Sequence, residues 1–389
     1  MTQSNEQFEM VAKTFFGFEE ILANELRALG AIKISQGNRM VKFFGDTGFI
    51  YKANLCLRTA LRILKPLRSG FVKNEKQLYN LVSSIDWQDY LDSSDSFRVQ
   101  STVHSETFTH SGFVNLKTKD AIADQFRDHT GVRPDVELDD PDLIIDVYIK
   151  HNTCVISLDS SGNSLHQRGY RVKTNLAPIN EVLAAGLLLQ AGWKGQTHFL
   201  DPMCGSGTIL IEAVMIACNI PVNINRKEFA FEKWLDWDMD LYDKIEKSCL
   251  QKVRDFNHQV KGYDIDSDTL EKAQTNIKNA NLSEFITLEE KDFFTSHKKE
   301  EAAVFIVFNP PYGERLKIDE ETFYKQIGDT LKNKYLNSNC WFITSNLEAI
   351  KYVGLRPSRK IKMFNAKLES RLLNYKIYAG SKKKKYNQH

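Results

Sequence analysis

The chain has no long apolar run, few cysteines and almost no net charge. Crossing a membrane takes about 18 consecutive apolar residues, and no stretch of the 389 residues approaches that length. The six cysteines include no C-x-x-C pair and no pair with a histidine at zinc-finger spacing. The sequence therefore predicts no disulfide scaffold, no structural zinc site and no membrane partner. The polar start of the chain and the unpaired thiols predict a cytoplasmic protein that needs no metal.

The near-balance of charge conceals an asymmetry along the chain. Lys+Arg number 52 against 50 Asp+Glu overall, yet residues 1–170 hold 19 against 22, and residues 171–389 hold 33 against 28. From residue 351 to the end there are 12 basic residues and one acid, Glu369. Such a run is typical of a phosphate-binding surface, although its last four lysines, 382–385, also fit a solvated tail. The charge pattern leaves a nucleic-acid partner open.

The order of predicted elements changes near residue 160, which predicts three domains. Residues 1–63 alternate short strands and helices, as in a small ferredoxin-like α+β domain. Residues 64–160 are mixed, ending in two strands, 143–149 and 153–158, joined as a hairpin. Ser160 to Asn163 is interpreted as a linker. Residues 161–389 then form the third predicted domain.

That third domain alternates strands with helices of 10 to 15 residues, which predicts an α/β fold with a doubly wound parallel sheet. Strands are expected at 198–200, 259–264, 286–289, 304–308 and 339–344, with helices at 180–191, 209–218, 268–279 and 320–335. In such sheets the ligand lies beyond the carboxyl ends of the strands. The motifs described next all fall at those ends, which indicates a single site.

A glycine-rich loop follows the first of these strands. The segment Asp201-Pro-Met-Cys-Gly205-Ser-Gly207-Thr208 precedes a predicted helix. The two glycines permit a close backbone approach to a ligand, and the helix start offers free N–H groups. The segment is neither a Walker loop nor a complete dinucleotide fingerprint. Alone, it would fit an ordinary turn as well as a ligand-binding loop.

Carboxylates end the next two strands. Asp264 is suited to accept hydrogen bonds from ribose hydroxyls, because Asp266, Ser267 or Asp268 fits better than Asp264 as the N-cap of the following helix. Asp292 could accept from an adenine amine, although a turn residue is an equal alternative for it alone. The strand ends therefore predict a nucleoside-like ligand.

The fourth strand ends in the most specific motif, Asn309-Pro310-Pro311-Tyr312-Gly-Glu-Arg315. The two prolines stiffen the backbone and leave the carbonyls of Asn309 and Pro310 without local donors. A planar amine would find two acceptors here, the Asn309 side-chain oxygen and the Pro310 carbonyl, with the Tyr312 ring free to stack. The alternative is a rigid turn with a buried tyrosine.

Taken together, these motifs resemble the class I S-adenosylmethionine-dependent methyltransferases that act on planar exocyclic amines. With the stretch Ser164-Leu-His166-Gln-Arg168-Gly-Tyr170-Arg171, they are similar to the THUMP-domain RNA guanine-N2 methyltransferases, in particular the bacterial enzymes for large-subunit ribosomal RNA. The resemblance implies a Rossmann-like methyltransferase domain behind a THUMP-like domain. Gln167 stands where that family usually has arginine. Some members carry a second methyltransferase beyond the point where this sequence stops, so only the guanine-N2 activity is carried over.

The resemblance implies roles for named residues. Catalysis is expected of Asn309, Pro310, Pro311 and Tyr312. Cofactor binding, with S-adenosylmethionine, is expected of Asp201, Pro202, Cys204, Gly205, Gly207, Thr208, Asp264, Ile265, Asp292, Phe293 and Asn309. Substrate contact is expected of His166, Arg168, Tyr170, Arg171 and Arg315.

The implied partner is RNA, namely 23S ribosomal RNA or a large-subunit assembly intermediate, with no obligate protein partner. Asn-Pro-Pro-Tyr also resembles the loop of adenine-N6 methylases and of enzymes that methylate glutamine side chains. A degenerate domain that binds RNA without catalysis is another alternative. A nicotinamide-dependent oxidoreductase is disfavoured by the incomplete glycine fingerprint.

Overall fold

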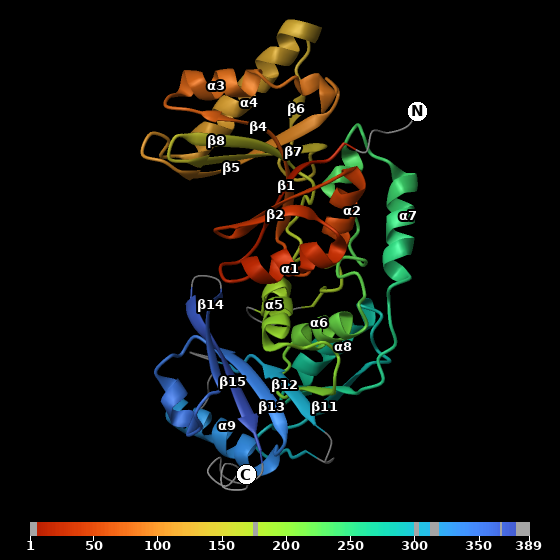
Figure 1. Ribbon diagram of the computed structural model, residues 1–389, viewed down its shortest axis with the longest axis vertical. Coiled ribbons are helices and arrows are strands. Elements are labelled where there is room, and N and C mark those ends of the chain that lie inside the picture. Colours follow the sequence, from red (N-terminus) through yellow and green to blue (C-terminus); the bar gives the residue numbers. More distant parts are fainter. Residues whose placement is uncertain (1–5, 174–177, 299–302, 312–318, 366–367, 379–389) are drawn as a thin grey trace. The chain divides into compact units, whose positions relative to one another are not determined.

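The computed structural model describes residues 6–173, 178–298, 303–311, 319–365 and 368–378. It divides into two compact units. The first comprises Met1–Thr14, Leu22–Leu165 and Arg226–Cys249, and the second Phe15–Ile21, His166–Asn225 and Leu250–His389. Both units combine helices with a β-sheet (Figure 1), so the predicted α/β class is confirmed.

The first unit contains one eight-stranded sheet in the order β2-β3-β1-β4-β8-β7-β5-β6. Neighbours pair antiparallel except β5, which runs parallel to β6 and β7. The strands are β1 (Phe8–Lys13), β2 (Ile32–Gly37), β3 (Met40–Gly45), β4 (Arg62–Phe71), β5 (Ser96–His104), β6 (Asp135–Val136), β7 (Leu143–Lys150) and β8 (Thr153–Asp159).

One face of this sheet forms the core of the unit. Alternate residues of β7, such as Ile145 and Val147, are fully buried, whereas Asp146 and Tyr148 point to the other face. The core face packs against helices α1 (Glu19–Leu29), α2 (Thr47–Cys56), α3 (Glu75–Ser83) and α4 (Ser111–Thr130), and α3 and α4 lie on one side of the strands in Figure 1. Within the part of the chain that the structure describes, the helices of this unit thus cover one face of the sheet.

Two segments of the structure run across the predicted domain boundaries. The strand β4 spans the predicted boundary at residues 63 and 64, so the first two predicted domains share one continuous sheet. Most of the predicted linker is buried: Ser160 and Ser161 are fully buried, and of its four residues Asn163 is the exposed one. Asn54 donates to the Ser160 hydroxyl at 2.9 Å and accepts from the Ser161 hydroxyl at 2.6 Å. These bonds tie the segment to α2.

One segment of the predicted methyltransferase range packs with the first unit. Residues Arg226–Cys249, which include the 3₁₀ turn η2 (Ala230–Lys233) and helix α7 (Met239–Leu250), belong to the first unit up to Cys249. Phe231 explains the placement, because its buried ring lies 4.6 Å from that of Tyr51 and 5.3 Å from that of Trp237. Aromatic burial therefore decides where this insertion packs.

The second unit contains a seven-stranded sheet in the order β11-β10-β9-β12-β13-β15-β14. Its first five strands run parallel, and β15 is antiparallel to both of its neighbours. The strands are β9 (His198–Asp201), β10 (Val260–Asp264), β11 (Ile286–Glu290), β12 (Val304–Phe308), β13 (Ser338–Thr344), β14 (Arg359–Asn365) and β15 (Leu368–Ile377). The sequence predicts the five parallel strands, and it does not predict β14 or β15.

Two apolar clusters cover the two faces of the second sheet. One holds α5 (Glu181–Ala191) and α6 (Thr208–Ala217) against residues such as Phe199 and Val307. The other holds α9 (Glu320–Lys334) and the 3₁₀ turn η4 (Ala349–Val353) against residues such as Ile306. Helix α8 (Ser267–Asn279) follows β10. Burial on both faces is what parallel sheets require, and it explains the continuous apolar run in β12.

Among the residues that the structure describes, no helix has both the length and the apolar character that a membrane crossing requires.

Candidate active site

A cavity of about 580 Å³ lies at the carboxyl ends of β9, β10 and β12. Its volume is in the range typical of small-molecule sites. Twelve of the residues expected from the sequence line it, namely Asp201, Pro202, Cys204, Gly205, Thr208, Asp264, Ile265, Asp292, Phe293, Asn309, Pro310 and Pro311. The structure therefore brings together motifs that are more than 100 residues apart in the sequence.

The loop after β9 is shaped by its two glycines. Gly205 and Gly207 have φ angles of 54° and 82°, in the left-handed region that glycine adopts without strain. Gly207 is the N-cap of α6, and the N–H of Gly205 donates to the Asp264 carboxylate at 3.0 Å. The Cys204 N–H donates to the Tyr263 carbonyl at 2.8 Å. These bonds attach the loop to the end of β10. The loop residues Cys204 and Gly205 therefore form part of the cavity lining.

Two carboxyl groups of the cavity are strongly desolvated. Burial raises the pKa of Asp201 well above its usual range, opposed by the Met203 N–H, which donates to its carboxyl at 3.1 Å. Burial also raises the pKa of Asp264, opposed by the Gly205 N–H. Asp266 rather than Asp264 caps α8, as expected, accepting from the Asp268 N–H at 3.1 Å. Asp264 is thus left facing the cavity as an acceptor.

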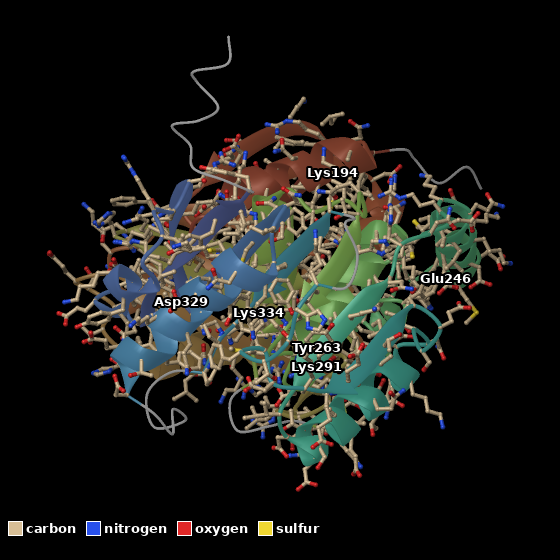
Figure 2. All side chains as sticks on the ribbon, turned by 90° about the horizontal axis from the view of Figure 1, so that it is seen from below. Lys194, Glu246, Tyr263, Lys291, Asp329 and Lys334 are labelled. Carbon is tan, nitrogen blue, oxygen red and sulfur yellow. The ribbon has the colours of Figure 1, made fainter. Side chains whose placement is uncertain are left out.

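The end of β11 is held beside the end of β10. The Lys291 N–H donates to the Asp264 carbonyl at 2.8 Å, and the Lys291 ammonium lies 4.8 Å from the centre of the Tyr263 ring. Figure 2 labels Lys291 and Tyr263 next to each other. Asp292 follows directly, and its carboxylate accepts from the Phe294 N–H at 2.8 Å. This arrangement carries Asp292 and the buried Phe293 into the cavity lining.

Asn309 carries the least satisfied polar atom of the cavity. Its side-chain oxygen Oδ1 is buried, and no described residue donates a hydrogen bond to it. A buried carbonyl without a donor costs about 1–3 kcal/mol. Pro310 is buried beside it, and the cavity reaches both residues and Pro311. An amine donor entering the cavity would remove that cost. Tyr312 and Arg315, also expected at this site, lie outside the described residues.

The structure corrects the expectation for Arg168 and Tyr170. Both side chains are buried, at 0% and 1% exposure, so neither is available to an RNA phosphate. The Arg168 guanidinium lies 3.3 Å from the Glu212 carboxylate, and the Tyr170 hydroxyl donates to the same oxygen at 3.1 Å. Glu212 is fully buried on α6. The two residues therefore pair with α6 behind the glycine-rich loop.

Arg171 contacts residues that line the cavity. Its guanidinium donates to the Thr208 hydroxyl at 2.8 Å and to the Ile179 carbonyl at 2.9 Å, and its Nε lies 2.8 Å from the Glu181 carboxylate. Burial raises the pKa of Glu181 to about 7, opposed by the charge of Arg171. Arg171 is therefore engaged by the start of α6 and by α5. His166 is half-buried, and its substrate contact stays a prediction.

The cavity also includes residues that sequence reasoning missed. They are Pro178, Ile179, Met203, Ser206, Ile209, Asp266, Thr269, Lys272, Phe294 and Phe323. Met203, Ser206 and Ile209 belong to or adjoin the glycine-rich motif and could have been included by position alone. Phe323 lies on α9, where it has the spacing of any core residue, so no local signal distinguishes it.

The basic end of the chain is partly neutralised where the structure describes it. Glu369 on β15 lies 2.7 Å from Lys362 and 2.8 Å from Arg371. Arg359 and Lys360 on β14 are exposed. The lysines 382–385 lie outside the described residues. The phosphate-binding role of this surface stays a prediction.

Three family models match consecutive parts of the chain. The model described as RMKL-like, methyltransferase domain matches residues 168–374, the THUMP domain model matches residues 72–159, and the RlmL ferredoxin-like domain model matches residues 9–64. The methyltransferase model alone covers more than half of the chain.

Curated relatives agree with these models. A protein of Cellvibrio japonicus named ribosomal RNA large subunit methyltransferase K/L is 37% identical over 377 residues, which make up 93% of this chain and 50% of that protein. A Synechocystis protein named as a provisional RNA methyltransferase is 35% identical over 365 residues, 93% of this chain and 95% of that protein. The chain thus spans about half the length of the K/L relative.

Solved structures give the same picture. SMU.472, named provisionally as a methyltransferase and solved with SAH, superposes with a TM-score of 0.86 at 27% identity, covering 97% of this chain and all of that one. A Listeria monocytogenes protein named as a predicted N6-adenine-specific DNA methylase superposes with a TM-score of 0.86 at 28% identity, covering 96% of this chain and 97% of that one.

Proposed function

Because this chain belongs to the RMKL-like methyltransferase family, with a THUMP and an RlmL ferredoxin-like domain ahead of the methyltransferase domain, we propose that it methylates the exocyclic N2 of a guanine in RNA, with S-adenosylmethionine as the methyl donor. The substrate in this proposal is 23S ribosomal RNA or a large-subunit assembly intermediate, and the location is the cytoplasm. The names of the curated relatives support the ribosomal substrate.

The fit of the cavity supports the cofactor. Its volume of about 580 Å³, the two glycines that let the backbone approach a ligand, and the Asp264 and Asp292 acceptors suit an adenosine with a charged side chain. The SAH-bound neighbour supports the same class of ligand. The residues that hold it in this proposal are Asp201, Gly205, Gly207, Asp264 and Asp292. When bound, S-adenosylmethionine supplies a methyl group already activated by a positive sulfur.

The buried Oδ1 of Asn309, which accepts no hydrogen bond from a described residue, is the observation that carries the proposed reaction. Guanine N2 is a poor nucleophile because its lone pair is delocalised into the ring. Acceptance of its two N–H groups by Asn309 Oδ1 and the Pro310 carbonyl would favour a pyramidal nitrogen whose lone pair is free to attack. After attack the nitrogen holds one surplus proton, which leaves to solvent. Tyr312 would stack on the base.

The target base has to leave its helix to reach such a cavity. A stacked, paired guanine cannot present N2 to an enclosed site, so the substrate nucleotide is unpaired or flipped. Ordinary surface binding of a duplex would leave Asn309 Oδ1 without a donor. The proposal therefore predicts a preference for an accessible guanine rather than for a long duplex.

A tritium-transfer assay tests this proposal. Labelled S-adenosylmethionine is supplied with protein-free ribosomal RNA from a strain that lacks the protein, and the nucleosides are then separated. Label in N2-methylguanosine of the large-subunit RNA is expected, and Asn309→Ala should remove it. Asn257→Ala, which alters an exposed asparagine before β10, is the matched control and should keep it. The absence of label from free RNA and from assembly intermediates would contradict the enzyme hypothesis and favour a non-catalytic RNA-binding protein.

Adenine N6 is the second candidate acceptor. It is a planar exocyclic amine that would make the same two hydrogen bonds, and the Listeria monocytogenes neighbour is named for that reaction. The same experiment separates the two acceptors, because label in N6-methyladenosine would replace the guanine proposal. The THUMP match favours RNA over DNA as the substrate of either reaction.

A further inference from the structure

The face of the eight-stranded sheet opposite its helices is polar, basic and aromatic. The pairing register places Glu9, Val11 and Lys13 of β1 on this face beside Met40, Lys42 and Phe44 of β3. On the other side of β4 it places Asp146, Tyr148 and Lys150 of β7 beside Thr153, Val155 and Ser157 of β8. None of these positions is needed for the core, because the alternate residues of each strand supply it.

A groove of about 450 Å³ runs across the middle of this face, between β1 and β7. Its floor consists of the buried residues Val11, Leu64 and Ser157. Its rim includes exposed Lys150 and His151. A register shift between Pro66 and Arg68 marks a bulge in β4, and bulges bend the strand that contains them. The volume is in the range of pockets that hold a small ligand or one nucleotide.

A lysine and an aromatic ring that start from strands three spacings apart meet on this face. The Lys13 ammonium, on β1, lies 4.6 Å from the centre of the Tyr148 ring on β7. The His104 ring lies 6.1 Å from the same tyrosine. Burial lowers the pKa of Lys13, and the charge of Asp146, which stands next to this pair in the groove lining, opposes that shift. A ring, a cation and a carboxylate acceptor therefore meet at one point of the groove.

Two further lysine and aromatic pairs flank the groove on the same face. The Lys73 ammonium lies 5.2 Å from the centre of the Phe71 ring, which is 60% exposed at the end of β4. The Lys33 ammonium lies 4.9 Å from the centre of the Phe44 ring on β3. Because Phe71 is 60% exposed, most of its ring is free to contact a ligand.

The charges of the face favour a polyanion. Its cations include Lys13, Lys33, Lys42, Lys73 and Lys150, and its acids include Glu9, Asp135, Asp146 and Asp159. Glu9 is paired with Lys42 at 3.0 Å, and Asp159 is paired with Arg62. Rings supply stacking surfaces and lysines supply phosphate contacts, which is the combination that single-stranded nucleic acids use. A duplex would offer phosphates but no base faces.

We propose that this face of the first unit is a docking platform for a single-stranded RNA segment, with one base held in the groove against Tyr148 and its neighbours directed toward Phe71 and Phe44. The phosphates would lie along Lys42, Lys150 and Lys73. The choice of RNA rests on the proposed function, whereas the face itself is defined by the contacts above. Its role would be to hold a part of the substrate other than the methylated base.

Fluorescence anisotropy with the full chain tests the platform without S-adenosylmethionine. The probe is a labelled, unstructured 12-nucleotide RNA of adenine and cytosine, and the comparison probe is the same strand annealed to its complement. The single strand should bind at least about fivefold more tightly than the duplex, since only its bases can stack. Equal binding of the two probes, or no binding of the single strand, would overturn the proposal.

The variants follow from the contacts. Tyr148→Ala should weaken binding about 5- to 100-fold, and Tyr148→Phe should keep it, because stacking needs the ring alone. Phe71→Ala should weaken binding by about threefold or more, whereas Phe113→Ala, which alters an exposed phenylalanine on α4 on the helical side, should not. Unchanged binding in both Tyr148→Ala and Phe71→Ala would overturn the proposal. If Tyr148→Ala fails to fold, Phe71→Ala decides.

Lysine variants test the phosphate contacts. Lys150→Ala should reduce the salt dependence of binding by about 0.7 in the logarithmic slope, as expected for one lost phosphate contact on a single strand. Lys76→Ala, which removes an exposed lysine of α3, should leave the slope unchanged. An equal slope in both would contradict the contact. Running Asn309→Ala in the same assay separates this proposal from the enzymatic one, because that variant should lose methyl transfer and keep this binding.

Discussion

The two sheets of this molecule use their surfaces in opposite ways. The parallel strands of the second unit are covered by apolar clusters on both faces, so the polar residues of its cavity gather at the strand ends. The sheet of the first unit is packed on one face, and its polar and aromatic residues spread over the other. Burial therefore decides where a sheet can present polar residues to a ligand. A sheet covered on both faces presents them at the ends of its strands, whereas a sheet covered on one face can present them across the other face.

The same difference explains why one site is visible in the sequence and the other is not. Loops at strand ends are contiguous, so Asp201 to Thr208 and Asn309 to Tyr312 appear as motifs. Residues on a sheet face alternate with core residues and come from different strands. Lys13 and Tyr148 are 135 positions apart, and only the strand order brings them together.

The largest expected effect concerns the buried polar groups of the second unit. Arg168→Ala would leave the carboxylate of Glu212 fully buried beside an empty space, which should cost about 3–5 kcal/mol of unfolding free energy. Urea unfolding of the full chain measures it. If Arg168 were instead an RNA contact, binding would fall and stability would not.

Two controls sharpen that result. Arg359→Ala removes an exposed arginine of β14 and should change the unfolding free energy by less than about 0.5 kcal/mol. The double variant Arg168→Met with Glu212→Leu replaces both charges by apolar groups and should be clearly more stable than Arg168→Ala. A double variant as unstable as the single one would mean that packing, rather than the ion pair, holds the segment to α6.

The next effect concerns the strand ends directly. Asn309→Ala should lower kcat by about 100-fold or more, because it removes an acceptor aimed at the reacting amine. The unfolding free energy should not fall, since Oδ1 has no donor among the described residues to lose. Steady-state kinetics with calorimetry of SAH binding checks both. A variant that loses SAH binding and kcat equally would assign Asn309 to the cofactor alone.

A smaller, pH-dependent effect is expected on the sheet face. Burial raises the pKa of Asp146 to about 6, opposed by the charge of Lys13, so the native fold favours the protonated carboxyl. The stability that this group contributes is present below its unfolded pKa, about 4, and is lost as the pH rises through about 6. Asp146→Asn does not titrate. It should therefore exceed the wild type by about 1–3 kcal/mol at pH 8 and lose that advantage near pH 4.

Chemical unfolding at the two pH values tests this prediction. Asp139→Asn, an exposed aspartate between β6 and β7, serves as the control and should show no such difference between the two conditions. An advantage for Asp146→Asn that is equal at both pH values would show that the hydrogen-bonding change, and not ionisation, is responsible.

The smallest expected effect separates binding from folding on the same face. Phe71→Ala should change the unfolding free energy by less than about 0.5 kcal/mol, because the ring is 60% exposed. Thermal unfolding in the absence of RNA measures it. A loss comparable with that of a core phenylalanine, about 3 kcal/mol or more, would mean that the ring packs in solution and is not presented to a ligand.

Most elements of the second unit follow from local pattern. Each of its five parallel strands and the helices α5, α6, α8 and α9 were predicted to within a few residues, because apolar runs bounded by turn residues and capped helices are local signals. The antiparallel strands β14 and β15 were missed, since their lysines and arginines obscure the alternation. In the first unit β2 and β4 were missed for a similar reason: both carry many exposed or half-buried residues.

The residues of the cavity could be predicted from the sequence more completely than the residues that contact the substrate. Its backbone-shaping residues are glycines and prolines whose conformational limits are properties of the residue itself, so Gly205, Gly207 and Pro310 were identified without the structure. The roles of Arg168 and Tyr170 depend on Glu212, more than 40 positions away, and a surface position and a buried ion pair look alike in sequence. Exposure is a property of the packed chain.

The sequence by itself determined the alternating strand and helix segments of the second unit, the glycine-rich loop, the Asn-Pro-Pro loop and thereby the class of ligand, because each is visible as a pattern of residues close in the chain. Only the tertiary structure decided that residues 226–249 pack with the first unit, that Ser160 and Ser161 are buried, and that Lys13 lies over Tyr148. Those outcomes depend on which distant apolar and charged groups can be buried together, and no local pattern encodes that choice.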